Sequence, residues 1–178
     1  MLDLVALLVS GGDPRSDVFT PTQGDSEVLF DGETLAGWTG DLRHWSVVDG
    51  AIVGRITEEQ PLERNTSLIW QGSRCGDFEL TLEVKMVGSG NSGVHYRGTP
   101  LESGGVDGYQ CDLAPNPAYV AMLYEEGGRG ILVEQGGNVQ IAEDGTQTAR
   151  REAAEPLPFE SGRWYTWTGL KSSATPPP

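Results

Sequence analysis

The segment Gly76–Val87, GDFELTLEVKMV, decides the fold class of this chain. Its apolar side chains (Phe78, Leu80, Leu82, Val84 and Met86) alternate with polar ones (Glu79, Thr81, Glu83 and Lys85). A period of two places alternate side chains on opposite faces of a β-strand, whereas a helical stripe needs a period of about 3.6. The segment therefore predicts an antiparallel strand with one buried face and one face in water.

The rest of the chain contains further short apolar runs separated by turn residues. From Val28 onward these runs are VLF, HWSVV, AIVGRI and TSLIW, and the Asp49-Gly50 pair between the second and third predicts a β-hairpin. Further strands are predicted at 92–97, 108–113, 121–124, 130–134 and 138–141. The 25 glycines and 11 prolines suit a turn-dense chain, and no segment has a convincing helical stripe. Many short strands of this kind predict an all-β sandwich or barrel.

Composition limits the partners that the chain can have. A length of 178 residues predicts one domain with a core of its own. The net charge of −14 and the lack of any Lys/Arg block argue against nucleic acid and against an anionic membrane surface. Cys75 and Cys111 lack the spacing of a metal site. They are interpreted as two unpaired thiols, with a disulfide as the alternative if the protein is exported.

The two ends of the chain differ from its middle. Residues 1–25 are interpreted as a leader or flexible arm, in which the apolar run Leu2–Val9 resembles the remnant of an export signal that starts further upstream. We therefore expect export to the periplasm or the extracellular space. The run is too short for a transmembrane segment. Residues 26–168 are predicted to form the β-sandwich, and residues 169–178, which end in PPP, a disordered tail.

Polar residues are concentrated on strand-like positions in the middle of the chain. Alternation in NSGVHYRG places His95 and Arg97 on one face with Asn91 near its entrance, and alternation in GYQCDL places Gln110 and Asp112 together. If the two strands are neighbours, a single face carries all of these groups. Such a face can bind the vicinal hydroxyl groups of a sugar, with an aromatic ring stacked on the sugar ring.

Tyr124, Glu125, Glu126 and Arg129 are predicted to lie at a loop beside this face. The alternative is an ordinary solvated sheet face, in which Arg97 pairs with a carboxylate and His95 is structural. The glycines of this loop lack the Lys-Ser/Thr ending of a phosphate loop, which argues against a nucleotide site. The tryptophans Trp38, Trp45, Trp70 and Trp164 are predicted to lie in the core.

Several motifs together resemble the 3-keto-disaccharide hydrolase family. They are LFDGETLAGWTG, WSVVDGAIVG, the GDFEL strand, NSG-x-x-YR, GYQ-x-D and LYEE-x-GRG, which occur in family order between about Val28 and Thr168. The resemblance implies a jelly-roll sandwich similar to concanavalin A and laminarinases. It also implies hydrolysis of glycosides oxidised at C3, by elimination at the glycosidic bond and addition of water.

The resemblance also suggests roles for individual residues. The candidates for the catalytic acid and base are Asp112, His95 and Glu125, in that order of preference. The candidates for substrate binding are Asn91, Arg97, Tyr109, Gln110, Tyr124 and Arg129. The expected partner is a small carbohydrate. No dense ligand motif demands a metal, but a divalent ion could be held near His95, Asp112 and Glu125.

Two alternatives to a catalytic function stay open. Members of the family continue past the WYTW segment with further strands, whereas this chain ends in SSATPPP, so an inactive, C-terminally truncated remnant is one alternative. The second alternative is a carbohydrate-binding module without catalysis. Release of an aglycone from a 3-keto glucoside separates the enzyme from the module, and cooperative unfolding separates both from a remnant that does not fold.

Overall fold

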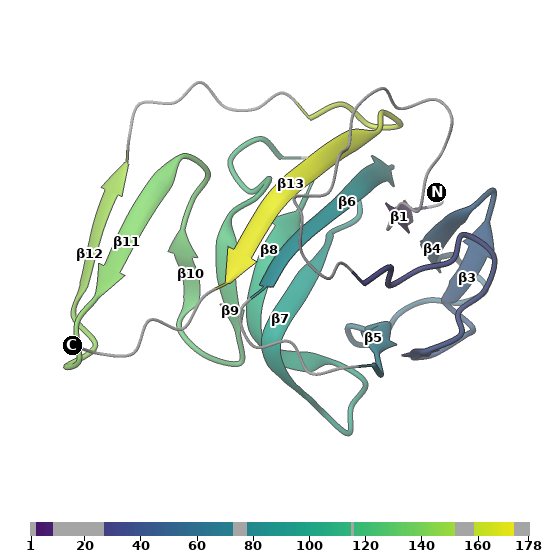
Figure 1. Ribbon diagram of the computed structural model, residues 1–178, viewed down its shortest axis with the longest axis horizontal. Helices are drawn as coiled ribbons and strands as arrows, with labels where there is room; N and C mark the ends of the chain where they lie inside the picture. Colours follow the sequence, from purple (N-terminus) through teal and green to yellow (C-terminus); the bar gives the residue numbers. More distant parts are fainter. Residues whose placement is uncertain (1–2, 9–26, 73–77, 115, 152–158, 173–178) are drawn as a thin grey trace.

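The computed structural model describes residues 3–8, 27–72, 78–114, 116–151 and 159–172 (Figure 1). Within these ranges the chain forms strands and turns and no helix, as the sequence predicts. The strands are β1 (Asp3–Leu8), β2 (Trp38–Thr39), β3 (Trp45–Val48), β4 (Ala51–Ile56), β5 (Ile69–Trp70), β6 (Phe78–Val87), β7 (Ser92–Pro100), β8 (Val106–Leu113), β9 (Leu123–Glu126), β10 (Gly130–Val133), β11 (Gly137–Ile141), β12 (Gln147–Arg151) and β13 (Tyr165–Ser172).

The described strands form two large antiparallel sheets and two small ones. The five-stranded sheet has the order β13-β6-β1-β4-β3, and the four-stranded sheet has the order β10-β9-β8-β7. The hairpin β11-β12 and the pair β2-β5 complete the set. Figure 1 shows β13 and β6 passing in front of β8 and β9, so the two large sheets lie in separate layers. The all-β fold is confirmed, and it is consistent with a sandwich; the jelly-roll order of strands stays a prediction.

The hydrophobic core lies between these two layers. Leu82, Val84 and Met86 of β6 have at most 1% of their surface exposed, and they cluster with Phe30, Ile52 and Leu113. Since Leu113 comes from β8, the cluster joins both large sheets. The alternation predicted for Phe78–Val87 is confirmed, because the polar residues between these positions are less buried. Each buried side chain of this size contributes roughly 1.5–3 kcal/mol through removal from water.

The Asp49-Gly50 hairpin is also confirmed. It joins β3 to β4, and both of its turn residues have positive φ angles, 51° at Asp49 and 78° at Gly50. Two positive φ angles define the turn type whose twist matches a right-handed pair of strands. The VLF run differs from the prediction, since residues 28–30 form no strand, although Phe30 is buried in the core.

The first strand corrects the interpretation of residues 1–25 as a leader or flexible arm. Asp3–Leu8 forms β1, which pairs with β4 on one side and with β6 on the other. Ala6, for example, lies opposite both Val53 and Lys85. Strands β4 and β6 would otherwise present unpaired N–H and C=O groups to each other, and β1 satisfies both edges. Residues 1–2 and 9–25 of the predicted leader lie outside the described residues, as do residues 173–178 of the predicted tail. Residues 169–172 of that tail belong to β13.

One predicted core tryptophan lies at the surface. Trp164 is 38% exposed, and the Nζ atom of Lys85 lies 4.6 Å from the centroid of its ring. The next residue, Tyr165, packs against the core instead, and alternation therefore turns Trp164 outward. Trp38 and Trp45 pack against the core as predicted, and the rings of Trp38 and Trp70 are 5.3 Å apart. Among the described residues, none belongs to a helix that could cross a membrane.

Candidate functional site

Strands β7 and β8 are neighbours, as the predicted site requires. His95 lies directly opposite Gln110, and Gly93 lies opposite Asp112. Residues that face each other across an antiparallel pair point to the same side of the sheet. The structure therefore brings His95, Gln110 and Asp112 together on one face of the four-stranded sheet.

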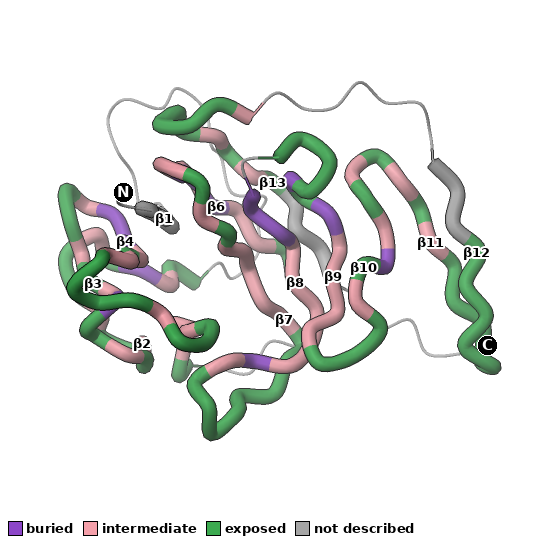
Figure 2. Tube along the Cα trace, turned by 180° about the vertical axis from the view of Figure 1, so that it is seen from behind, coloured by how far each residue is buried: buried purple, intermediate pink, exposed green. Residues whose placement is uncertain are grey.

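This face points away from the core. The opposite face of β7 and β8 carries Val94, which packs against the core cluster, and Leu113, which belongs to it. Tyr96 lies on that inner face too, where its ring is 5.9 Å from the ring of Phe78 on β6. The face with His95 is therefore the outer face of the four-stranded sheet, and Figure 2 views the molecule from the side of this sheet.

The register continues across all four strands. Gln110 lies opposite Tyr124 on β9, and Tyr124 lies opposite Ile131 on β10. His95, Gln110, Tyr124 and Ile131 thus form a line across the sheet with one residue from each strand, which we call the cross-sheet row. The first three are half-buried, and Ile131 is 47% exposed.

A chain of hydrogen bonds fixes one end of the row. The Gln110 Nε2 donates to Asp112 Oδ1 at 2.8 Å, and the Asn91 Nδ2 donates to Asp112 Oδ2 at 3.3 Å. Gln110 also forms a hydrogen bond with His95 that favours the protonated imidazole. Asp112 is only 1% exposed, and its burial raises the pKa of its carboxyl group, against the effect of the bonds from Asn91 and Gln110. We call Asn91, Asp112, Gln110 and His95 the polar chain.

The imidazole of His95 is biased toward its neutral form. Burial lowers its pKa, while the charge of Glu126 and the hydrogen bond with Gln110 act in the opposite direction. Its Nδ1 atom is buried and has no hydrogen-bond partner in the described part of the chain. Glu126 lies opposite Gly108 and so shares the outer face with His95. The sequence placed Glu126 at the loop beside the polar face but not among the catalytic or binding candidates, although strand alternation from Tyr124 would have placed it on the face itself.

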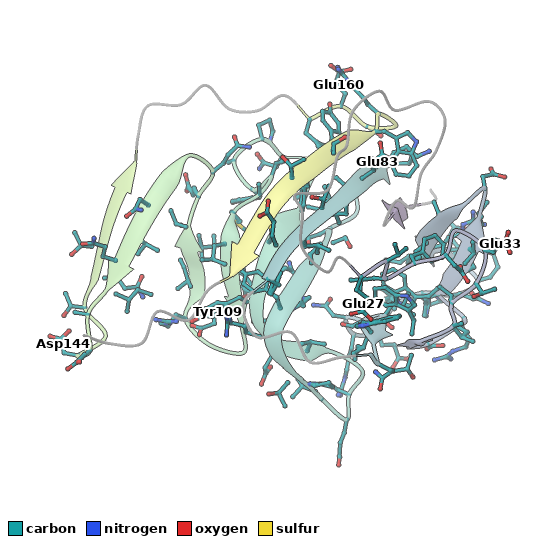
Figure 3. All side chains as sticks on the ribbon, in the orientation of Figure 1. Glu27, Glu33, Glu83, Tyr109, Asp144 and Glu160 are labelled. Atoms are coloured by element: carbon teal, nitrogen blue, oxygen red, sulfur yellow. The ribbon has the colours of Figure 1, made fainter. Side chains whose placement is uncertain are left out.

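Glu125 belongs to a different group of residues. It was predicted to lie at a loop, but it belongs to strand β9, where it lies opposite Tyr109 and therefore on the inner face. Its carboxylate forms an ion pair with Arg129, which lowers the pKa of Glu125, and Arg129 also donates to the Tyr109 hydroxyl at 3.3 Å. Figure 3 labels Tyr109 near the C-terminal end of β13. The predicted acid/base set of Asp112, His95 and Glu125 is therefore divided between two faces.

The same division bears on the predicted metal position near these three residues. Because Glu125 points to the inner face, it cannot join His95 and Asp112 around one ion. Within the described ranges, no group of three or more His, Cys, Asp and Glu side chains could hold a metal ion. Cys111 also faces inward and is a free thiol, and burial raises its pKa to about 11. Cys75 lies outside the described residues.

Arg97 departs from the predicted alternation. The register shifts between Tyr96 and Thr99, so Arg97 and Gly98 together oppose the single residue Gly108. This is a β-bulge, and Arg97 has a φ angle of 50° within it. A bulge interrupts the period of two, and alternation therefore cannot assign Arg97 to the face of His95. Arg97 is exposed at the edge of the sheet.

The model of the 3-keto-alpha-glucoside-1,2-lyase-like domain matches residues 25–168. The chain belongs to this family. The resemblance drawn from the sequence motifs is thereby confirmed. The 3-keto-alpha-glucoside-1,2-lyase-like domain contains the whole four-stranded sheet, with the cross-sheet row and the polar chain, whereas β1 precedes the matched range. No curated protein and no solved structure matches the chain.

Proposed function

We propose that the chain is a lyase or hydrolase that cleaves glycosides of sugars oxidised at C3, and that the sugar binds to the outer face of the four-stranded sheet. The observation that carries this proposal is the polar chain from Asp112 to His95, which lies on a half-exposed sheet face inside a domain of the lyase-like family. It presents a neutral imidazole beside fixed hydrogen-bonding groups, which is the combination that proton transfer from carbon requires.

The proposed reaction begins at C2 of the oxidised sugar. The ketone at C3 makes the C2–H bond acidic, so a base removes this proton and leaves an enolate on the C3 oxygen. The enolate then collapses to the ketone with a C1–C2 double bond, while the C1–O bond breaks and the leaving oxygen takes up a proton. Water adds its hydroxyl to C1 and its proton to C2, which gives net hydrolysis.

In this proposal His95 is the base, which requires its buried and unpartnered Nδ1 atom to become accessible when the sugar binds. Burial keeps its imidazole neutral near neutral pH, and the carboxylate of Glu126 stabilises the imidazolium that forms when the proton is taken. Asp112 has almost no exposed surface, so we assign it a positioning role through Gln110 rather than contact with the sugar. This reverses the order of preference that the sequence suggested for Asp112 and His95. We assign the Tyr124 hydroxyl a hydrogen bond to the substrate, because Tyr124 lies opposite Gln110 on the same face.

The test is release of the aglycone from a 3-keto glucoside by the full chain. We expect His95→Gln to lower kcat by about 10²–10⁴-fold, the usual contribution of a general acid or base. Asp112→Asn should lower kcat less and should also change the pH profile, because it acts on His95 only through Gln110. Glu125→Gln is the control on the inner face and should leave kcat within a few-fold of the wild type. Full activity in His95→Gln would eliminate it as the base.

A carbohydrate-binding module is the second candidate, since a half-buried tyrosine beside amide groups also suits binding without reaction. Equal binding of a plain glucoside and of its 3-keto form, without release of the aglycone from either, would favour the module.

Export to the periplasm or extracellular space also stays part of our proposal. Because β1 occupies most of the apolar run, the export signal would have to lie upstream of it, and cell fractionation tests this point.

A further inference from the structure

We infer that the Tyr124–Ile131 end of the cross-sheet row is the leaving-group subsite, and that it selects glycosides whose aglycone is aromatic or apolar. The inference rests on the proposed function, because it assumes that the sugar ring lies over the polar end of the same row. The proposed reaction requires only that the leaving group is attached to C1 through an oxygen atom. The inference adds which chemical class of aglycone the site prefers.

The first observation is the change of polarity along the row. His95 and Gln110 belong to the polar chain, and both are held by hydrogen bonds. The next two positions carry the ring of Tyr124 and the aliphatic side chain of Ile131. Facing side chains on neighbouring strands have Cβ atoms about 4.5–5.5 Å apart, so these two form one continuous apolar surface.

The second observation is the length of the row. Neighbouring strands lie about 4.8 Å apart, so four strands span roughly 14 Å from His95 to Ile131. That span accommodates two six-membered rings side by side. A sugar ring over the polar half therefore places its aglycone over Tyr124 and Ile131, with the bond to be cleaved near the boundary between Gln110 and Tyr124.

The third observation is the exposure of Ile131. On β10 the neighbouring Leu132 has only 5% of its surface exposed, whereas Ile131 has 47% exposed. Ile131 is therefore a solvent-facing apolar side chain at the end of the row, next to the ring of Tyr124. A second sugar as leaving group needs several hydrogen bonds, yet Ile131 offers none and Tyr124 offers a single hydroxyl. An aromatic aglycone instead stacks on the tyrosine ring and covers the isoleucine.

Binding to the full chain tests the inference without any requirement for catalysis. The probes are phenyl glucoside and methyl glucoside, measured by calorimetry. We expect the wild type to bind the phenyl compound about tenfold more tightly, the usual effect of a small apolar group in a matching pocket. Ile131→Thr should remove most of this preference, and Ile131→Leu should keep it. Ile141→Thr on β11 is the matched control, since Ile141 is an exposed isoleucine outside the row, and it should bind as the wild type does.

Circular dichroism confirms that each variant is folded before binding is compared. A phenyl preference that survives Ile131→Thr, or that is lost equally in Ile141→Thr, overturns the inference. So does a wild type that binds both compounds equally or binds neither.

Cleavage of the 3-keto forms of the same two glucosides separates this inference from the proposed function. If the phenyl preference depends on Ile131 but neither keto compound is cleaved, the proposed function fails and the apolar subsite stands. If both keto compounds are cleaved with equal kcat/KM, the proposed function stands and the subsite is wrong. Preferential cleavage of the phenyl compound that disappears in Ile131→Thr supports both.

Discussion

At the scale of single residues, burial shifts the pKa values of two neighbouring groups in opposite directions. It raises the pKa of the Asp112 carboxyl and lowers that of the His95 imidazole, because both shifts favour the uncharged form in a poorly solvated position. Gln110 connects the two by hydrogen bonds and acts against both shifts. Shifts of this kind are common at functional sites, which is consistent with the proposed roles of these two residues.

The raised pKa of Asp112 makes a prediction about stability. Because the folded state holds this proton more tightly than the unfolded chain, Asp112 contributes stability at low pH, and that contribution is lost as pH rises from the ordinary value of 3.8 through the folded value. Asn cannot ionise, so we expect the stability of the wild type relative to Asp112→Asn to fall as pH rises through this window. Urea unfolding of both proteins at several pH values measures the difference. A difference that is independent of pH would contradict the prediction.

At the scale of elements, the sequence predicted those strands whose pattern is local. Strand β6 and the β3–β4 hairpin were predicted because alternation and a two-residue turn are readable without knowledge of the neighbours. Strand β1 was missed because its short apolar run resembles an export signal, and only its pairing with β4 and β6 distinguishes the two. A strand was predicted at 121–124, but Glu125 and Glu126 were placed in a loop, whereas β9 continues to Glu126. Nothing local shows that the side chains of Glu125 and Glu126 point to opposite faces.

The bulge at Arg97 was also missed. A positive φ angle at a non-glycine residue has no sequence signature, and the nearby glycines are its only local trace. The bulge matters for the site because alternation holds only up to it. Of the residues predicted on this face from alternation, His95, Gln110 and Asp112 are confirmed there, whereas Arg97 is not assigned to it. The position of Arg97 relative to that face was not predictable without the register of the two strands.

The bulge makes a prediction at Gly108. This residue has a φ angle of 132°, and a Cβ atom added to it would lie 2.5 Å from the Cα of Gly98. We expect Gly108→Ala to destabilise the fold by roughly 2 kcal/mol or more through backbone strain and this contact. Gly104→Ala is the matched control, since Gly104 has a φ angle of 91° and nothing within 4 Å of the added atom. Equal losses of unfolding free energy in the two variants would show that the close approach of the strands has no effect.

Strand β1 makes a second prediction at this scale. Ala6→Pro removes an N–H group from a strand that is paired on both sides, and it should destabilise the five-stranded sheet by about 3 kcal/mol or more. Ala6→Ser keeps the N–H group and serves as the control. Thermal unfolding followed by circular dichroism measures both variants. If Ala6→Pro unfolds at the same temperature as Ala6→Ser, residues 3–8 are not a paired strand of the folded protein.

At the scale of the whole molecule, one core joins both large sheets. Ile52 comes from β4, Leu82 from β6 and Leu113 from β8, and all three belong to the same buried cluster. These three residues lie within the range 25–168 that matches the family, whereas β1, which pairs between β4 and β6, precedes that range. Such a molecule should unfold as a single unit rather than sheet by sheet.

We therefore expect Leu82→Ala to weaken the entire structure. Leu82 is 1% exposed, and its truncation leaves a cavity in the shared core that should cost roughly 2–5 kcal/mol. Tryptophan fluorescence should report on the surroundings of the five tryptophans, of which Trp38, Trp45 and Trp167 pack against the core, and circular dichroism should report on all the strands. The two transitions should coincide in urea and should move together in the variant. Separate midpoints would mean that the two sheets unfold independently.

The register of the four-stranded sheet has a practical consequence for laboratory evolution. Each strand of this sheet contributes one residue to the cross-sheet row. The last two residues of the row, Tyr124 and Ile131, do not belong to the polar chain. A small library that randomises only codons 124 and 131 would therefore vary the proposed aglycone end of the row while leaving the polar chain unchanged. Screening such a library against a panel of chromogenic keto-glycosides would be an economical route to enzymes with new selectivity.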